Sequence, residues 1–171
     1  DSLPLAGNIF NARGLPGVGK TEYLLKYFIR MLKGKPTAKI LVSAPKLEQL
    51  KTIQKSIEQL KGEVSQEIVY RTYEELETSK DLDTFSYVII DESSLLKPSG
   101  FLNKMDTIKP KVILSGDELQ ETSGLYAMYY GDNSFIIDKT EKHIQYLSER
   151  GETLDTVVRS GNVDTAKYID T

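Results

Sequence analysis

The chain has 171 residues, of which 39% are hydrophobic and 27% are charged, and this composition is typical of a soluble globular protein with one sizeable core. A net charge of −3 excludes a globally basic surface, so any nucleic acid has to be bound by a local patch. The absence of cysteine excludes disulfides and thiolate metal sites and fits a reducing compartment, and the one histidine, His143, disfavours a histidine-based metal site.

The sequence contains no apolar run long enough to cross a membrane and no signal-peptide pattern. It begins at Asp1 rather than at a methionine. We therefore expect a piece of a longer polypeptide, in which residues 1–171 form a single domain.

The first predicted strand, Asn8–Ala12, leads into a segment with the pattern G-x-x-x-x-G-K-[ST] of a phosphate-binding P-loop, or Walker A motif. Its glycines allow positive φ and bring backbone amides close to phosphates. Lys20 adds a positive charge, the Thr21 hydroxyl can hold Mg²⁺, and a predicted helix over Thr21–Lys33 directs its positive dipole end at the same anions. The expected nucleotide contacts are Gly14, Pro16, Gly17, Val18, Gly19, Lys20 and Thr21.

The remaining elements alternate between strands and helices, and several strands are apolar on both faces. This pattern predicts an α/β fold with a mainly parallel sheet. The further predicted strands are Lys39–Ser43, Glu67–Tyr70, Phe85–Ile90, Lys111–Ser115, Ser134–Asp138 and Ile144–Leu147. The further predicted helices are Lys46–Lys61, Thr72–Thr78 capped by Thr72, a stretch within Leu119–Tyr130 and Thr153–Val158, with loop and helix over Ser93–Met105 interrupted by Pro98 and Gly100.

Ligands of open parallel sheets collect at the carboxyl ends of the strands. The strand that begins near Phe85 ends at Asp91-Glu92 and has the form of a Walker B motif. Asp91 is placed to bind Mg²⁺, and Glu92 to orient or deprotonate the water that attacks the γ-phosphate. The alternative is a strand closed by solvated acidic residues, and the upstream P-loop favours the Walker B interpretation.

The strand Lys111–Ser115 ends at the sequence Gly-Asp-Glu-Leu-Gln, residues 116–120. The amide of Gln120 can donate to the γ-phosphate and accept from the attacking water, and Gly116 would lie beside the nucleotide. A turn followed by a helix capped by Asp117 is an equally compatible interpretation.

Taken together, GLPGVGKT at 14–21, VIIDES at 88–93 and GDELQ at 116–120 resemble motifs I, II and III of superfamily 1 helicases. The form is that of the viral RNA helicases found in positive-strand RNA virus replicases, and the resemblance spans about residues 8–150. It implies a RecA-like P-loop NTPase domain with helices on both faces of the sheet. It also implies ATP and Mg²⁺ as cofactors, and a second RecA-like domain that completes the motor.

The resemblance also implies contacts with single-stranded RNA, or DNA, after two strands. The segment from Ser43 to Lys46 lies where motif Ia is found. The segment from Tyr70 to Tyr73 resembles motif Ib, in which an arginine pairs with phosphate and tyrosines stack on bases. A plain strand exit and a helix cap are the alternatives. The expected nucleic-acid contacts are Ser43, Ala44, Pro45, Lys46, Arg71, Thr72 and Tyr73.

Arg150 follows an apolar strand and matches the arginine that closes the first domain in this family. In that role it would contact the γ-phosphate and stabilise charge in the transition state. Arg159 is the competing candidate, and a surface salt bridge is the other interpretation. Motifs V and VI of the second domain are absent, so we expect this piece alone to hydrolyse ATP slowly or not at all.

The sequence thus predicts the motor domain of an RNA helicase in viral RNA replication, located in the host cytoplasm and associated with other replication proteins. Three alternatives stay open. The chain can be a viral movement or packaging NTPase that unwinds nothing, or an interaction module with a relict P-loop. It can also be a small-molecule kinase, although no arginine-rich lid segment follows the Walker B strand.

Overall fold

The structure is a computed structural model that describes residues 8–13, 19–32, 38–60, 66–96, 100–105, 107–115, 133–138 and 143–148. The strands are β1 (Ile9–Arg13), β2 (Lys39–Ala44), β3 (Glu67–Thr72), β4 (Tyr87–Asp91), β5 (Lys111–Ser115), β6 (Asn133–Asp138) and β7 (His143–Ser148). The α-helices are α1 (Lys20–Met31), α2 (Leu47–Glu58), α3 (Tyr73–Glu77) and α4 (Gly100–Lys104), and two 3₁₀ turns are η1 (Leu82–Thr84) and η2 (Ser93–Leu95).

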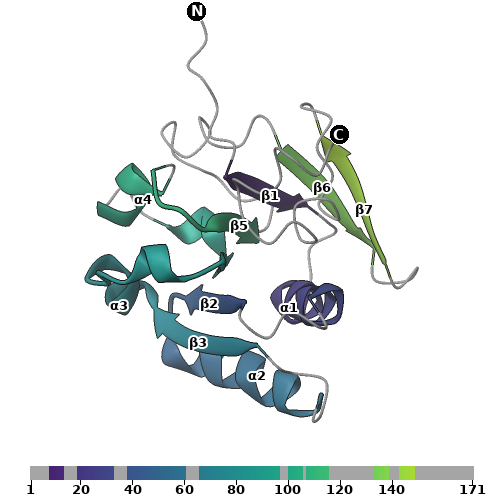
Figure 1. The fold of residues 1–171 in the computed structure, drawn as a ribbon. Helices are drawn as coiled ribbons and strands as arrows, with labels where there is room; N and C mark the ends of the chain where they lie inside the picture. Colours follow the sequence, from purple (N-terminus) through teal and green to yellow (C-terminus); the bar gives the residue numbers. More distant parts are fainter. Residues whose placement is uncertain are drawn as a thin grey trace, which may run out of the picture.

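The described strands form one sheet in the order β3-β2-β4-β5-β1-β6-β7 (Figure 1). Every neighbouring pair from β3 to β6 is parallel, whereas β7 pairs antiparallel with β6. The predicted α/β fold with a mainly parallel sheet is confirmed. An antiparallel last strand was not anticipated from the sequence.

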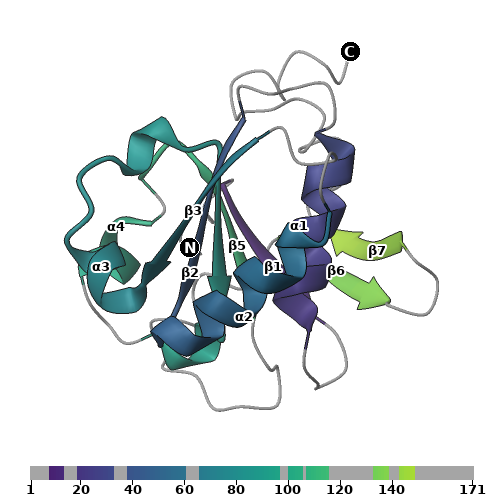
Figure 2. The ribbon, with the colours of Figure 1, turned by 90° about the horizontal axis from the view of Figure 1, so that it is seen from below.

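Helices cover both faces of the sheet (Figures 1 and 2). Because successive side chains of a strand point to opposite faces, β2 contributes to two separate hydrophobic clusters. Ile40 and Val42 belong to the cluster under α1 and α2, which includes Phe28. Leu41 belongs to the cluster under α3 and α4, which includes Phe101. A strand covered on both faces has to be apolar throughout, which is why β2 reads as a continuous apolar run.

Local sequence signals explain where the helices begin. Gly19 takes the left-handed conformation with φ 88° and precedes α1 directly, as the P-loop pattern requires. Thr72 caps α3 as predicted, because its hydroxyl accepts from the Glu75 amide while the Glu75 carboxylate accepts from the Thr72 amide at 2.8 Å. The Gln49 side chain accepts from the Lys46 amide at 3.0 Å, so α2 begins one residue later than predicted.

For two further differences from the predicted boundaries, the structure shows the local contacts. The strand expected from Phe85 begins at Tyr87, because the Phe85 amide donates to the Leu82 carbonyl at 3.2 Å and closes η1. Gly100 was expected to interrupt a helix, but it is the first residue of α4. A Cβ on Gly100 would lie 2.9 Å from a carboxylate oxygen of Glu77, whose carboxylate accepts from the amide of the next residue, Phe101. The helices predicted within Leu119–Tyr130 and over Thr153–Val158 lie outside the described residues.

Asn8 fixes the start of β1 against the α4–β5 connection. The residue is 7% exposed, and its side-chain amide nitrogen lies 2.9, 3.3 and 3.2 Å from the carbonyls of Met105, Ile108 and Pro110. This single amide serves buried carbonyls about one hundred residues away in sequence. It therefore holds β1 in place.

We expect Asn8→Ala to lower the free energy of unfolding by about 1–3 kcal/mol, because the buried carbonyls lose their donor. Asn8→Asp should cost more, since a carboxylate repels carbonyl oxygens. Urea denaturation measures both effects. Gln54→Ala, at an exposed position of α2, is the control and should change stability by less than about 0.5 kcal/mol. Equal midpoints for Asn8→Ala and this control would contradict the assignment.

Candidate nucleotide-binding site

Three hydroxyl and carboxylate groups from distant parts of the chain meet at the carboxyl edge of the sheet. The Thr21 hydroxyl donates to Asp91 Oδ1 at 2.6 Å, although the two residues lie 70 positions apart. The hydroxyl oxygens of Thr21 and Ser115 lie 3.2 Å apart, within hydrogen-bond distance. Asp91 and Ser115 are register partners on β4 and β5, and Thr21 is only 2% exposed. The predicted Walker A threonine and Walker B aspartate are thus in direct contact.

The N-terminus of α1 faces this same group through its second residue, Thr21. The helix has 12 residues, and its N-cap, Gly19, has no side chain with which to cap the first-turn amides. Amides at the start of a helix, together with the positive end of its dipole, favour an anion. The backbone at Gly19 and Lys20 therefore has the form expected for the end of a phosphate-binding loop.

The oxygen atoms available as ligands at this site fit a magnesium ion. Mg²⁺ prefers hard oxygen ligands, keeps several waters, and usually binds proteins through one or two carboxylates or hydroxyls plus phosphate oxygens. Thr21 and Asp91 supply one hydroxyl and one carboxylate at a single point. Among the described residues, no cluster of three or more acidic, histidine or cysteine side chains forms an alternative metal site.

Glu92 has an unusual backbone conformation. Its φ of 51° and ψ of 46° are left-handed, and it is the one non-glycine residue with positive φ in the described part of the chain. Such a conformation costs about 1–3 kcal/mol and persists where surrounding contacts enforce it. The Tyr73 hydroxyl provides such contacts, lying 2.5 Å from the Asp91 carbonyl and 2.8 Å from the Glu92 carbonyl.

The electrostatics of Glu92 differ from those of an ordinary surface carboxylate. Burial raises the pKa of its carboxyl group, and the neighbouring charge of Asp91 raises it further. The positive charge of Lys46 opposes both effects and lowers this pKa. Lys46, predicted as a nucleic-acid contact, is therefore close enough to influence the predicted catalytic carboxylate.

The predicted motif Ia residues divide into buried and accessible members. Ser43 and Ala44 are fully buried within β2, whereas Pro45 is partly exposed and Lys46 is exposed. Only the last two can offer side chains to a nucleic acid in this conformation. The Ser43 hydroxyl finds no hydrogen-bond partner within the described part of the structure, and neither does that of Ser93, which follows Glu92. Such buried hydroxyls are uncommon, and functional sites are one place where they persist.

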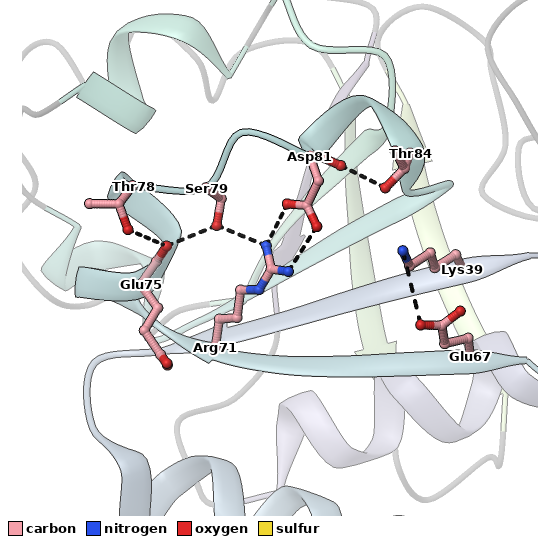
Figure 3. A network of polar contacts seen from close by, with 8 residues as sticks. All are labelled: Lys39, Glu67, Arg71, Glu75, Thr78, Ser79, Asp81 and Thr84. Carbon is pink, nitrogen blue, oxygen red and sulfur yellow. Dashed lines mark hydrogen bonds and ion pairs between the residues drawn. The ribbon is translucent and has the colours of Figure 1, made fainter.

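Arg71, predicted to pair nucleic-acid phosphate, is engaged within the protein. Its guanidinium donates to both carboxylate oxygens of Asp81 at 2.7 and 2.8 Å and to the Ser79 hydroxyl at 2.8 Å (Figure 3). It also lies over the Phe85 ring, 5.5 Å from the ring centroid. The hydrogen bonds from Arg71 lower the pKa of Asp81 to about 2.

The three residues predicted as motif Ib contacts all have partners within the protein, and their contact with nucleic acid stays a prediction. Arg71 is paired with Asp81, Thr72 caps α3, and Tyr73 binds the backbone at Asp91 and Glu92. The helix-cap interpretation of this segment is confirmed. Pairing of Arg71 with a phosphate would require displacement of a bidentate carboxylate.

Several predicted contacts lie outside what the structure describes. For Lys20 the backbone begins α1, and the role of its ammonium group stays a prediction. The other predicted nucleotide and catalytic residues that lie outside the described ranges are Gly14, Pro16, Gly17, Val18, Gly116, Gln120 and Arg150.

The sequence did not point to Ser115 as part of this site, and it indicated a different role for Tyr73. Ser115 ends a predicted strand, but its contact with Thr21 depends on which strand lies between β1 and β4. Tyr73 was predicted as a base-stacking side chain, whereas its hydroxyl reaches the Walker B segment. Ser115 could have been predicted only from its register pairing with Asp91, and that pairing cannot be known before the strand order is known.

Comparisons with protein-family models, with curated proteins and with solved structures found no match to this chain. None of the helices in the described segments is long and apolar enough to cross a membrane.

The Arg71–Asp81 pair predicts a pH-dependent contribution to stability. Because the pKa of Asp81 is lowered to about 2 from an ordinary 3.8, the unfolded state binds more protons between these values. The stabilisation is fully present above about pH 4 and is lost as pH falls towards 2. Asp81→Asn should cost about 0.5–1 kcal/mol at neutral pH, a modest value because the Asp81 side chain is 41% exposed.

Urea midpoints of wild type and Asp81→Asn, measured from neutral pH downwards, test this prediction. The gap between the two proteins should close between about pH 4 and pH 2. Glu74→Gln, which removes an exposed carboxylate on α3, is the control and should show no such convergence. A gap that stays constant with pH would contradict the role given to the Arg71–Asp81 pair.

Proposed function

We propose that this chain is the nucleotide-binding and hydrolysing RecA-like domain of a superfamily 1 RNA helicase that acts in viral RNA replication. One observation carries the proposal: the Thr21 hydroxyl donates to the Asp91 carboxylate at 2.6 Å. A P-loop threonine and a Walker B aspartate are expected to share one Mg²⁺, and this requires their oxygens to lie together. The sequence patterns alone did not guarantee that proximity.

The surrounding geometry supports a hydrolytic site. Bound Mg²⁺ would neutralise charge on the β- and γ-phosphates of ATP. The protein groups would have complementary tasks: Thr21 and Asp91 would hold the ion, the amides at the start of α1 would receive the phosphates, and Glu92 would orient or deprotonate the attacking water. Gln120 and Arg150 are proposed to contact the γ-phosphate from segments that follow β5 and β7.

The proposed partners follow from the same assignment. Single-stranded RNA would cross the strand ends near Pro45 and Lys46, where accessible side chains lie. A second RecA-like domain would complete the nucleotide cleft, and other replication proteins would assemble with the motor in the host cytoplasm.

A nucleotide hydrolase without unwinding activity is the second candidate, and a specific observation favours it. Arg71, Thr72 and Tyr73 all have partners within the protein, so the predicted motif Ib contacts are not free in this conformation. Such a protein would use the same nucleotide site, and its hydrolysis would not respond to RNA.

We expect the wild-type chain to bind ATP in the presence of Mg²⁺ and Lys20→Ala to bind it much more weakly, because the phosphates lose their cationic partner. Glu92→Gln should retain binding and lower the hydrolysis rate by about 10²–10⁴-fold, because the water loses its base. Isothermal titration and single-turnover hydrolysis measure these effects. Lys26→Ala, further along α1, is the matched control for Lys20→Ala. Wild-type protein that fails to bind ATP·Mg²⁺ would overturn the proposed function.

RNA dependence separates the two candidates. If the chain belongs to a helicase, single-stranded RNA should stimulate hydrolysis, and Lys46→Ala should weaken RNA binding and flatten its salt dependence by about one unit of slope. Lys51→Ala, at another exposed position near the start of α2, should leave both unchanged. A hydrolysis rate that does not change with RNA in wild type, Lys46→Ala and Lys51→Ala would favour the hydrolase without unwinding activity.

A further inference from the structure

Tyr73 joins α3 to the Walker B segment. It is the first residue of α3, and its ring packs at the edge of the hydrophobic cluster under α3 and α4. Its hydroxyl lies within hydrogen-bond distance of two successive carbonyls, those of Asp91 and Glu92. A phenol has a single proton, which these two acceptors share. The contact therefore constrains the peptide between the metal-binding and the catalytic residue.

The Glu92 peptide depends on external contacts for its conformation. Glu92 has left-handed backbone angles, which few residues other than glycine adopt without support. Its carbonyl also accepts from the Leu95 amide at 2.9 Å, which opens η2. The tyrosine hydroxyl and the Leu95 amide thus hold the same carbonyl. The orientation of that peptide sets the direction of the bond from Cα to Cβ of Glu92.

The residues on either side of Tyr73 are held by side-chain hydrogen bonds. Thr72 and Glu75 form a reciprocal capping box at the start of α3. Arg71, one residue earlier, is fixed by its bidentate contact with Asp81 (Figure 3). The backbone from which the Tyr73 side chain extends is therefore held by contacts before and after Tyr73. From this position the Tyr73 hydroxyl can hold the carbonyls of Asp91 and Glu92 in place.

We propose that Tyr73 is a positioning residue for Glu92: its hydroxyl holds the Glu92 peptide in the left-handed conformation that directs the carboxylate to the attacking water. This inference rests on the proposed function, in which Glu92 acts on that water. It assigns Tyr73 to the chemistry of the nucleotide site, in place of the base stacking expected from the sequence. Removal of one oxygen atom, more than fifteen residues from Glu92 in the chain, is then expected to impair hydrolysis.

Tyr73→Phe tests the proposal because it removes the hydroxyl and retains the ring. We expect kcat for ATP hydrolysis to fall by about tenfold, with KM and the affinity for ATP·Mg²⁺ unchanged. Tyr27→Phe, on α1 beside Phe28, is the matched control and should retain the wild-type kcat. A wild-type kcat in Tyr73→Phe would overturn the proposal.

A double-mutant comparison shows whether Tyr73 acts through Glu92. In a Glu92→Gln background the carboxylate is already lost, so Tyr73→Phe should cause no further loss of hydrolysis. An equal fold-loss in both backgrounds would overturn the proposal, because the hydroxyl would then act by another route.

Amide hydrogen exchange provides a readout that does not require hydrolysis. Tyr73→Phe should accelerate exchange at the amides of Leu95 and Leu96, which donate to the Glu92 and Ser93 carbonyls in η2, whereas Tyr27→Phe should not. Unchanged exchange at these amides in Tyr73→Phe would overturn the proposal. The two failures are distinguishable: wild type that binds no nucleotide contradicts the proposed function, whereas normal exchange and normal kcat in Tyr73→Phe contradict only the role of Tyr73.

Discussion

The hydrogen bond from Thr21 to Asp91 is the constraint on which the site depends. It requires the start of α1 and the end of β4 to meet at one edge of the sheet, although 70 residues separate them. That meeting is possible only because parallel strands direct their carboxyl ends to the same edge. Thr21 is only 2% exposed, so loss of the carboxylate would leave its hydroxyl, in a low-dielectric surrounding, to the longer contact with Ser115. The bond therefore contributes to stability and also arranges the oxygens that a metal ion would bind.

The sequence predicted the elements well because their signals are local. Apolar runs marked the strands, Gly19 marked the start of α1, and Thr72 marked the cap of α3. The lateral order of the strands has no such local signal. That β5 lies between β1 and β4 is decided by packing across the whole sheet, and so the contact between Ser115 and Thr21 could not be predicted. The same limit applies to the antiparallel pairing of β6 and β7.

The residues expected to contact nucleic acid illustrate a second limit. Motif spacing identifies a guanidinium at Arg71, but not the carboxylate of Asp81, which lies ten residues later and binds it. Asp81 belongs to the same chain and is always available to Arg71. A phosphate would have to displace Asp81, and its attraction to Arg71 would have to compensate for the cost of desolvation. Ser43 was also expected to contact nucleic acid, but its side chain is buried. Helices cover both faces of the sheet and bury every side chain of β2 after Lys39. Accessible side chains begin only where the strand ends, at Pro45 and Lys46.

The Asp91–Glu92 segment is held from both sides of β4. Thr21, from α1, binds the Asp91 side chain, and Ser115, from β5, contacts Thr21. Tyr73 approaches from the start of α3 and binds the backbone. The side chain of one residue and the peptide of the next are therefore fixed by different elements. A displacement of either half of the sheet would alter the relative placement of the Asp91 and Glu92 side chains. This arrangement explains how a strained peptide at Glu92 is tolerated: the contacts that enforce it belong to the same framework that brings Thr21, Asp91 and Ser115 together.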